Sequence, residues 1–274
     1  MRPSPFWQTV LFIALCAFTA INLTPVIWAF MTSIKLPVDA FSVPPKLIFT
    51  PTFEFHYQVW VEKQFWQFLI NSAIIAVSVV CISVPIGTMA AFALSRMRGS
   101  GSRGILFGLL AMRMFPHILL AIPFFVLAQG LSLIDTYPAM ILALVAINQP
   151  FTIWMMRSFF MDVPLELDEA ARIDGCNLWQ VFYQVALPVV RPGLWITSLF
   201  SLLLAYNEFL FALVLTGPNT KTLPVAIAEY GAEDLNYWSL SAAAAIGIML
   251  PIVLFMMALQ RHLVRGLAFG AVKG

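Results

Sequence analysis

Long apolar stretches without charge are the feature that most limits how this chain can fold. No Asp, Glu, Lys or Arg occurs from Pro3 to Ile34 or from Gln64 to Ser95. About 20 apolar residues are enough for a helix to cross the hydrocarbon core of a bilayer. Because 61% of the residues are hydrophobic and only 10% are charged, too little polar surface is available for a water-soluble globule. We therefore expect an all-α integral membrane protein.

Six segments of this kind predict six transmembrane helices within a single domain that covers residues 1–274. The first is interpreted as a span rather than a signal peptide, because its uncharged run is too long and no small-x-small cleavage site follows it. The predicted spans are residues 7–31, 68–94, 104–128, 137–156, 194–215 and 240–260.

The distribution of lysine and arginine predicts that both termini are cytoplasmic. In that orientation residues 33–65 and 217–239 are external loops, and most basic residues fall on the cytoplasmic side. The only lysine or arginine residues in the external loops are Lys35, Lys46, Lys63 and Lys221. The first loop is rich in proline and aromatic residues and is expected to be a small structured hairpin or lid. The net charge of +2 gives no indication of nucleic-acid binding.

Residues 161–192 form a cytoplasmic insert that is predicted to be a helical hairpin. Asp162 is a candidate N-cap and Pro164 fits the first turn of a helix that runs to about Asp174. Gly175 stands where a helix end favours a positive φ angle.

The second arm of the hairpin has a start signal and a stop signal. Asn177 with Gln180 resembles a capping box, and the helix is expected to end at Leu187-Pro188 because proline cannot continue it.

Two interpretations of the hairpin were open from its pattern: an anchor on lipid headgroups, or a docking surface for a protein. Interfacial anchors usually carry lysine and arginine that meet anionic lipid. Between residues 162 and 174, Arg172 is the only basic residue, against the acidic residues Asp162, Glu166, Asp168, Glu169 and Asp174. An acidic hairpin is repelled by an anionic leaflet, so a protein partner is favoured.

Several motifs, in order, resemble those of permeases from binding-protein-dependent ABC importers. Within the hairpin these are Glu169-Ala170-Ala171, Asp174-Gly175 and Leu187-Pro188, whose spacing fits the EAA loop of that family. Elsewhere they are Arg113-Met-Phe-Pro116, Leu133-Ile-Asp135-Thr136, Asn207-Glu208-Phe-Leu-Phe-Ala-Leu and the ending from Gly266 to Gly274. The ending resembles the tails of MalG-like carbohydrate permeases. Cys176 and Val185 depart mildly from the usual alanine and isoleucine.

The resemblance implies a type I ABC importer permease fold in a bacterial inner membrane. In such a complex the hairpin docks in a cleft on an ATPase subunit, so that ATPase closure swings the membrane helices. The implied partners are a homologous second permease, two ATPase subunits, an external solute-binding protein, membrane lipid and a sugar. The implied coupling residues are Glu169, Ala170, Ala171, Asp174, Gly175, Leu187 and Pro188, the small alanines allowing close approach of the ATPase.

Two further contacts are expected. The resemblance assigns the C-terminal residues Gly270, Lys273 and Gly274 to the ATPase dimer, although a frayed tail is the alternative. The acidic external residues Glu229, Glu233 and Asp234 are expected to contact the binding protein.

No enzymatic site is apparent from the sequence. The chain lacks a GxxxxGK[ST] motif, and His56, His117 and His262 are scattered along it without metal-ligand spacing. We expect a transport subunit that binds no cofactor or metal, with ATP and Mg²⁺ held by its partners.

Arg113 and Glu208 are the ionisable residues that lie deepest in the predicted spans. Burial of either is costly, so each is expected to face a cavity, the bundle interior or an opposite charge. Both an Arg113–Glu208 ion pair and a cavity-facing role remained open. Further candidates for the translocation path are Asn148, Gln149, Tyr206 and Asn207. Asn148-Gln149-Pro150 also predicts a break in the fourth span, or bonds to a neighbouring helix.

The solute class was left partly open. A sugar or sugar derivative is favoured by the resemblance, with a polyol or glycerol phosphate as the alternative. A six-span secondary transporter would leave the EAA-like hairpin without explanation.

Overall fold

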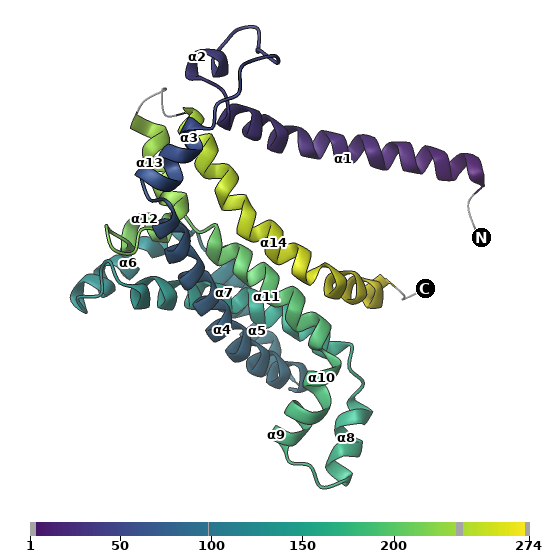
Figure 1. The fold of residues 1–274 in the computed structure, drawn as a ribbon. Helices are drawn as coiled ribbons and strands as arrows, with labels where there is room; N and C mark the ends of the chain where they lie inside the picture. Colours follow the sequence, from purple (N-terminus) through teal and green to yellow (C-terminus); the bar gives the residue numbers. More distant parts are fainter. Residues whose placement is uncertain (1–3, 98, 234–237, 272–274) are drawn as a thin grey trace. The chain divides into compact units, whose positions relative to one another are not determined.

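The computed structural model describes residues 4–97, 99–233 and 238–271, and all regular elements in these ranges are helices (Figure 1). Four of them are long and apolar enough to cross a membrane: α1 (Pro5–Ser33), α4 (Trp66–Arg96), α7 (Tyr137–Met161) and the first part of α14 (Trp238–Ala271). Two pairs of helices pass the same test together but are sharply bent, so the described chain offers between four and six spans.

The chain divides into two compact units. One comprises residues 1–66 and 226–250, and the other comprises residues 67–225 and 251–274. In the first unit, α1 is followed by α2 (Pro37–Ala40), α3 (Glu54–Tyr57) and a π-helical segment, Gln58–Glu62. The loop predicted to be a lid is held by specific contacts: Lys35 is 2% exposed and lies between the rings of Trp28 and Phe49, 5.2 and 4.8 Å from their centroids.

In the second unit, α7 packs against α5 (Ser100–Met114), α11 (Arg191–Tyr206) and α12 (Leu210–Leu215), and α6 (His117–Gly130) packs against α12. Helix α13 (Leu223–Glu233) follows α12 along the chain.

The prediction of a break at Asn148-Gln149-Pro150 is wrong, because α7 continues through Pro150. Its polar side chains are bonded to neighbouring helices. The Asn148 amide donates to the Ser201 hydroxyl on α11, and Gln149 Nε2 donates to the Ser83 carbonyl on α4 over 3.3 Å. The amide nitrogens of Asn148 and Gln149 thus connect α7 to α11 and α4 on either side of Pro150.

The breaks occur in the third and fifth predicted spans. Residues 104–128 are not one helix, since α5 and α6 meet at an angle of 91°. Phe115 is extended, with ψ 131°, because proline at the next position disfavours helical geometry.

The fifth span, residues 194–215, is interrupted between α11 and α12. Here side chains replace the helical backbone pattern: Asn207 Nδ2 donates to the Leu203 carbonyl over 2.9 Å, and Glu208 Oε1 accepts from the Phe211 N–H over 3.1 Å. The sequence predicted a span at each place but did not indicate that its helix is interrupted.

Candidate functional site

A helical hairpin extends from one end of the second unit (Figure 1). Its first arm is α8 (Leu165–Ile173). Its second arm comprises α9 (Leu178–Gln180), a π-helical segment (Val181–Ala186) and α10 (Leu187–Val189). Two local predictions are confirmed: Gly175 has a φ of 88°, and Asn177 and Gln180 form a reciprocal capping box with bonds of 3.0 and 2.7 Å.

Two boundary predictions are wrong. Asp162 does not cap α8. It ends α7 instead, where its N–H donates to carbonyls of the last turn, and α8 begins only after Pro164. The second arm does not stop at Pro188. This proline lies in the first turn of α10, where the missing N–H costs little, and α11 begins directly after Val190.

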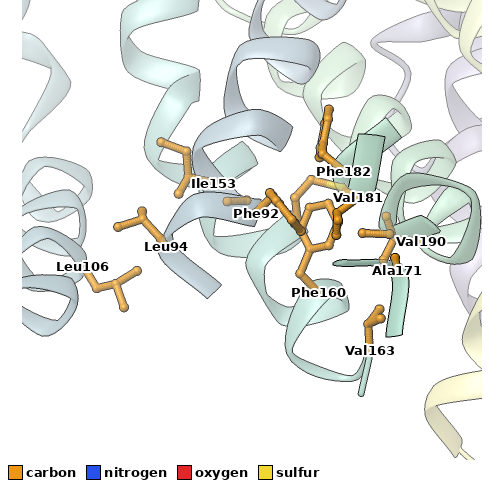
Figure 2. Packing of buried hydrophobic residues seen from close by; sticks show 13 residues of the cluster. Phe92, Leu94, Leu106, Ile153, Phe160, Val163, Ala171, Val181, Phe182 and Val190 are labelled. Atoms are coloured by element: carbon orange, nitrogen blue, oxygen red, sulfur yellow. The ribbon is translucent and has the colours of Figure 1, made fainter. Parts of the chain in front are cut away.

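The base of the hairpin is fixed to α4 and α7 by aromatic packing. The rings of Phe92 on α4, Phe160 on α7 and Phe182 in the second arm pack together, with Phe92 5.4 Å from Phe160 and 5.2 Å from Phe182 (Figure 2). Ala171 belongs to the same buried cluster and is 8% exposed. Its small side chain therefore contributes to the packing of the hairpin itself.

One arginine joins three helices at this base. Arg96, the last residue of α4, forms an ion pair with Asp168 of α8, with 2.6 Å between Nε and Oδ2. Its Nη1 also donates to the carbonyl of Phe160 near the end of α7, over 2.9 Å. Asp168 is 7% exposed, so the pair is largely shielded from solvent. The sequence placed Asp168 among the acids of the hairpin but gave no link to Arg96, because the two residues are 72 positions apart.

The far side of the hairpin is open. Glu169, Ala170, Asp174 and Gly175 are exposed, whereas Leu187 and Pro188 are partly buried. Exposed apolar side chains that the sequence analysis missed accompany them: Ile173, Leu178, Trp179 and Tyr183. The sequence contains a pattern that could have identified them, because apolar residues near the tip of an otherwise acidic hairpin indicate a contact surface.

A pocket of 180 Å³ lies in the second unit. Its polar wall residues are Arg113 of α5, His117 of α6, Asn148 of α7 and Glu208, which lies between α11 and α12. The guanidinium of Arg113 lies 5.0 Å from the centre of the Phe151 ring. Arg113 and Glu208 thus share a pocket, and among the described residues no ion pair within 4 Å joins them.

The other three polar candidates do not line this pocket. Gln149 is directed to α4 by its bond to Ser83. Tyr206 is 4% exposed, and its hydroxyl has no hydrogen-bond partner in the described part of the chain. Asn207 is exposed and bonds back to its own helix.

Asp135, in the connection between α6 and α7, organises the segment that follows α12. Its carboxylate accepts hydrogen bonds of 2.7 to 3.1 Å from Gly217, Asn219 and Thr220. Partial burial by itself raises the pKa of Asp135, but the Thr220 hydroxyl and the three backbone N–H groups outweigh it and lower the pKa to about 2.

Replacing Asp135 with asparagine is expected to lower the melting temperature at pH 7 and to remove a pH dependence. A carboxylate with a folded pKa of about 2 and an unfolded value of 3.8 stabilises the fold above about pH 4, and this contribution is lost as the pH falls towards 2. Melting curves of the detergent-solubilised protein, followed by tryptophan fluorescence, should therefore converge for the two proteins between these pH values. A constant difference over this range would contradict the assignment.

Only some of the residues predicted to contact the binding protein or, in the C-terminal tail, the ATPase lie within the described ranges. Glu229 is exposed on α13, and Glu233 is the last residue of that helix. Gly270 lies in α14, whereas Asp234, Lys273 and Gly274 lie outside the described residues.

Comparisons with known proteins give consistent results. A family model described as "Binding-protein-dependent transport system inner membrane component" matches residues 83–269. The probable ABC transporter permease protein y4oR of Sinorhizobium fredii is 37% identical over 258 residues, which cover 94% of this chain and 93% of the relative. The trehalose transport system permease protein SugB of Mycobacterium tuberculosis is 36% identical over 255 residues, covering 92% and 93%.

The fold has a close counterpart among solved structures. A chain of a bacterial ABC transporter involved in the import of the acidic polysaccharide alginate superposes with a TM-score of 0.73 at 23% identity, covering 95% of this chain and 98% of that chain.

Proposed function

This chain belongs to the family of binding-protein-dependent transport system inner membrane components, and from that we propose that it is the permease subunit of an ATP-driven importer for a sugar or sugar derivative. The solute class is supported by the trehalose permease, which is similar over nearly the whole chain, and by the fold shared with the alginate importer. The subunit forms part of the translocation path and performs no chemistry itself.

The observation that carries the proposal is the attachment of the hairpin. Its base is fixed to α4 and α7 by the aromatic cluster and by Arg96, while Glu169 on its first arm and Ile173 and Trp179 near its turn remain exposed. A rigid projection with a mixed acidic and apolar tip is suited to bind another protein and to transmit its movement to the helices at the base of the hairpin. We assign the tip to the ATPase subunit.

The proposed topology has six spans and cytoplasmic termini. Helices α5 and α6 count as one bent span, and α11, which passes the span test together with residues 178–189, counts as the core of another that continues into α12; these two add to α1, α4, α7 and α14. The positive-inside rule then places the hairpin in the cytoplasm. The proposed complex contains a second permease, two ATPase subunits that bind ATP and Mg²⁺, and an external solute-binding protein.

Contacts of the remaining predicted residues follow from this topology. The acidic residues Glu229, Glu233 and Asp234 are proposed to contact the binding protein. Gly270, Lys273 and Gly274 are proposed to reach the ATPase dimer. Arg113, Asn148 and Glu208 are proposed to line the translocation path.

Replacing Glu169 with lysine is expected to abolish most of the coupling between ATP hydrolysis and transport. The substitution reverses the charge of an exposed residue on the first arm of the hairpin, and like charges across a docked interface cost several kcal/mol. The measurement is co-purification of the ATPase in mild detergent, followed by solute-stimulated ATP hydrolysis in proteoliposomes with the binding protein present.

The matched control is Glu62→Lys, which reverses another exposed carboxylate in the segment between α1 and α4 and is expected to retain both properties. Normal coupling in Glu169→Lys would show that the hairpin tip is not the ATPase contact. A wild-type protein that purifies without an ATPase, yet transports solute, would overturn the proposed function as a whole.

A further inference from the structure

The interrupted helices of the second unit and three of its polar side chains occur at the same place; Asn148 is buried, Glu208 is partly buried and Arg113 is exposed. Arg113 lies in the last turn of α5, directly before the bend at Phe115-Pro116, and Glu208 lies in the gap between α11 and α12. Asn148 lies in the continuous helix α7, and all three line the 180 Å³ pocket. A volume of this size accommodates several water molecules, each of which takes about 30 Å³.

The polar groups of this pocket retain unused hydrogen-bonding capacity. Asn148 is 6% exposed; its amide nitrogen donates to Ser201, and its Oδ1 has no partner among the described residues. A buried amide oxygen without a donor is costly, so a donor is expected inside the pocket. Glu208 uses only Oε1, for the Phe211 N–H, within the described chain. The Arg113 guanidinium stacks on Phe151 and is engaged in no hydrogen bond there.

An apolar cavity adjoins the polar one. It has a volume of 430 Å³ and shares Arg113, His117 and Ile147 with the first pocket. Phe115 and Phe124 contribute aromatic surface to its wall. Pockets of several hundred Å³ that combine apolar walls with a few converging polar groups are typical ligand sites. The ligand that fits such a lining has hydroxyl groups on one edge and C–H surface on another.

We propose that these two adjoining cavities form a binding site for an uncharged sugar or polyol within this subunit. The inference rests on the proposed function and narrows its solute class. The charges of Arg113 and Glu208 cancel, so the wall has no excess of positive charge to attract an acid. A carboxylate accepts hydrogen bonds from two hydroxyl groups, a guanidinium donates hydrogen bonds to hydroxyl oxygens, and Asn148 Oδ1 accepts one more hydrogen bond. An acidic sugar would instead bring its charge close to Glu208.

The test uses the complete complex in proteoliposomes, with its binding protein and ATPase. The panel consists of the uncharged solutes trehalose, maltose and sorbitol and of the acidic solutes glucuronic acid and alginate disaccharide. The wild-type complex is expected to import an uncharged member in an ATP-dependent manner. The quantity compared among variants is solute imported per ATP hydrolysed, because a merely structural defect lowers import and hydrolysis together.

Glu208→Gln keeps an oxygen that accepts the Phe211 N–H but removes the charge. The amount of solute imported per ATP is expected to fall about tenfold, the loss typical of one charge-assisted hydrogen bond. Arg113→Gln is the second variant and is expected to show a loss of similar size. Glu62→Gln, an exposed carboxylate outside the second unit, is the matched control and is expected to transport like the wild type.

Three results would overturn the assignment: ATP-driven import of an acidic member in preference to the uncharged ones, import of no member of the panel, or an unchanged ratio in both Glu208→Gln and Arg113→Gln. The first of these leaves the proposed importer function intact. Failure of the ATPase to accompany the wild-type protein tests that function separately.

Discussion

Replacing Asp168 with alanine is expected to destabilise the protein by about 3–5 kcal/mol, the usual cost of leaving one member of a shielded ion pair without its partner. The reason is the position of Arg96, whose guanidinium is held between Asp168 and the carbonyl of Phe160. Without the carboxylate, α8 loses its polar attachment to α4. Thermal unfolding of the purified subunit measures the loss of stability, and the ratio of transport to ATP hydrolysis measures the loss of coupling.

A double-mutant cycle identifies the pair as the cause. Arg96→Ala combined with Asp168→Ala should be less damaging than the sum of the two single changes, because the double variant leaves no uncompensated charge. Glu166→Ala is the matched control, since Glu166 is an exposed acid in the same helix. Additive effects of the two substitutions, or equal stability of Asp168→Ala and Glu166→Ala, would rule out the Arg96–Asp168 ion pair as a stabilising contact.

Replacing Gly193 with valine is expected to be comparably severe. A Cβ at this position would lie 2.4 Å from two ring carbons of Phe159, which is too close for any real contact. Gly193 lies in the first turn of α11 and Phe159 near the end of α7, so the clash forces apart two helices where they approach closely. Overpacking of a tight contact costs about 1–3 kcal/mol for a small addition, and the branched side chain of valine adds more.

The yield of folded protein in membranes and its melting temperature are the measurements for Gly193. Gly193→Ala should be intermediate, and Gly104→Ala in α5 is the control because a Cβ there meets no atom within 4 Å. If Gly193→Val melted like Gly104→Ala, the close approach of α7 and α11 would be refuted.

The parts of the fold that the sequence predicted correctly are those with local causes. Gly175 and the Asn177–Gln180 capping box are signals within a few residues, and the hairpin turn follows from them. The apolar runs likewise predicted both ends of α1 and α4 and the starts of α7 and α14 to within two residues, because hydropathy decides whether a segment is apolar enough to span. Helices α7 and α14 continue beyond the predicted spans, to Met161 and Ala271.

The errors concern positions where competing local signals are settled by neighbouring helices. Pro116 and Pro150 both stand inside apolar runs, yet only the first interrupts its helix. Around Pro150, Asn148 and Gln149 bond to α11 and α4, and this information comes from residues that are distant in the sequence. Hydropathy did not reveal the interruption at Asn207-Glu208 either, because apolar residues surround it.

The candidate site shows the same division. The exposed tip of the hairpin was identified from acids and spacing, whereas the Arg96–Asp168 pair joins residues far apart in the chain and has no local signature. Arg113 and Glu208, the two charges in predicted spans, were singled out by their cost in a membrane, and both line the 180 Å³ pocket. Arg113 and Glu208 share one pocket without forming an ion pair, and this arrangement depends on the interruptions between α5 and α6 and between α11 and α12. The sequence did not reveal these interruptions.

Helix α1 has a consequence for how the sequence of this protein can change over time. None of the side chains in its apolar window is buried within the described chain, although the window is strongly hydrophobic. Exchanges among leucine, isoleucine, valine and phenylalanine there disturb no internal packing, so selection acts on hydropathy and length rather than on residue identity. The family model begins at residue 83, beyond this helix. Helix α1 is therefore expected to diverge fastest among relatives, while Arg96, Asp168 and Gly193 vary least.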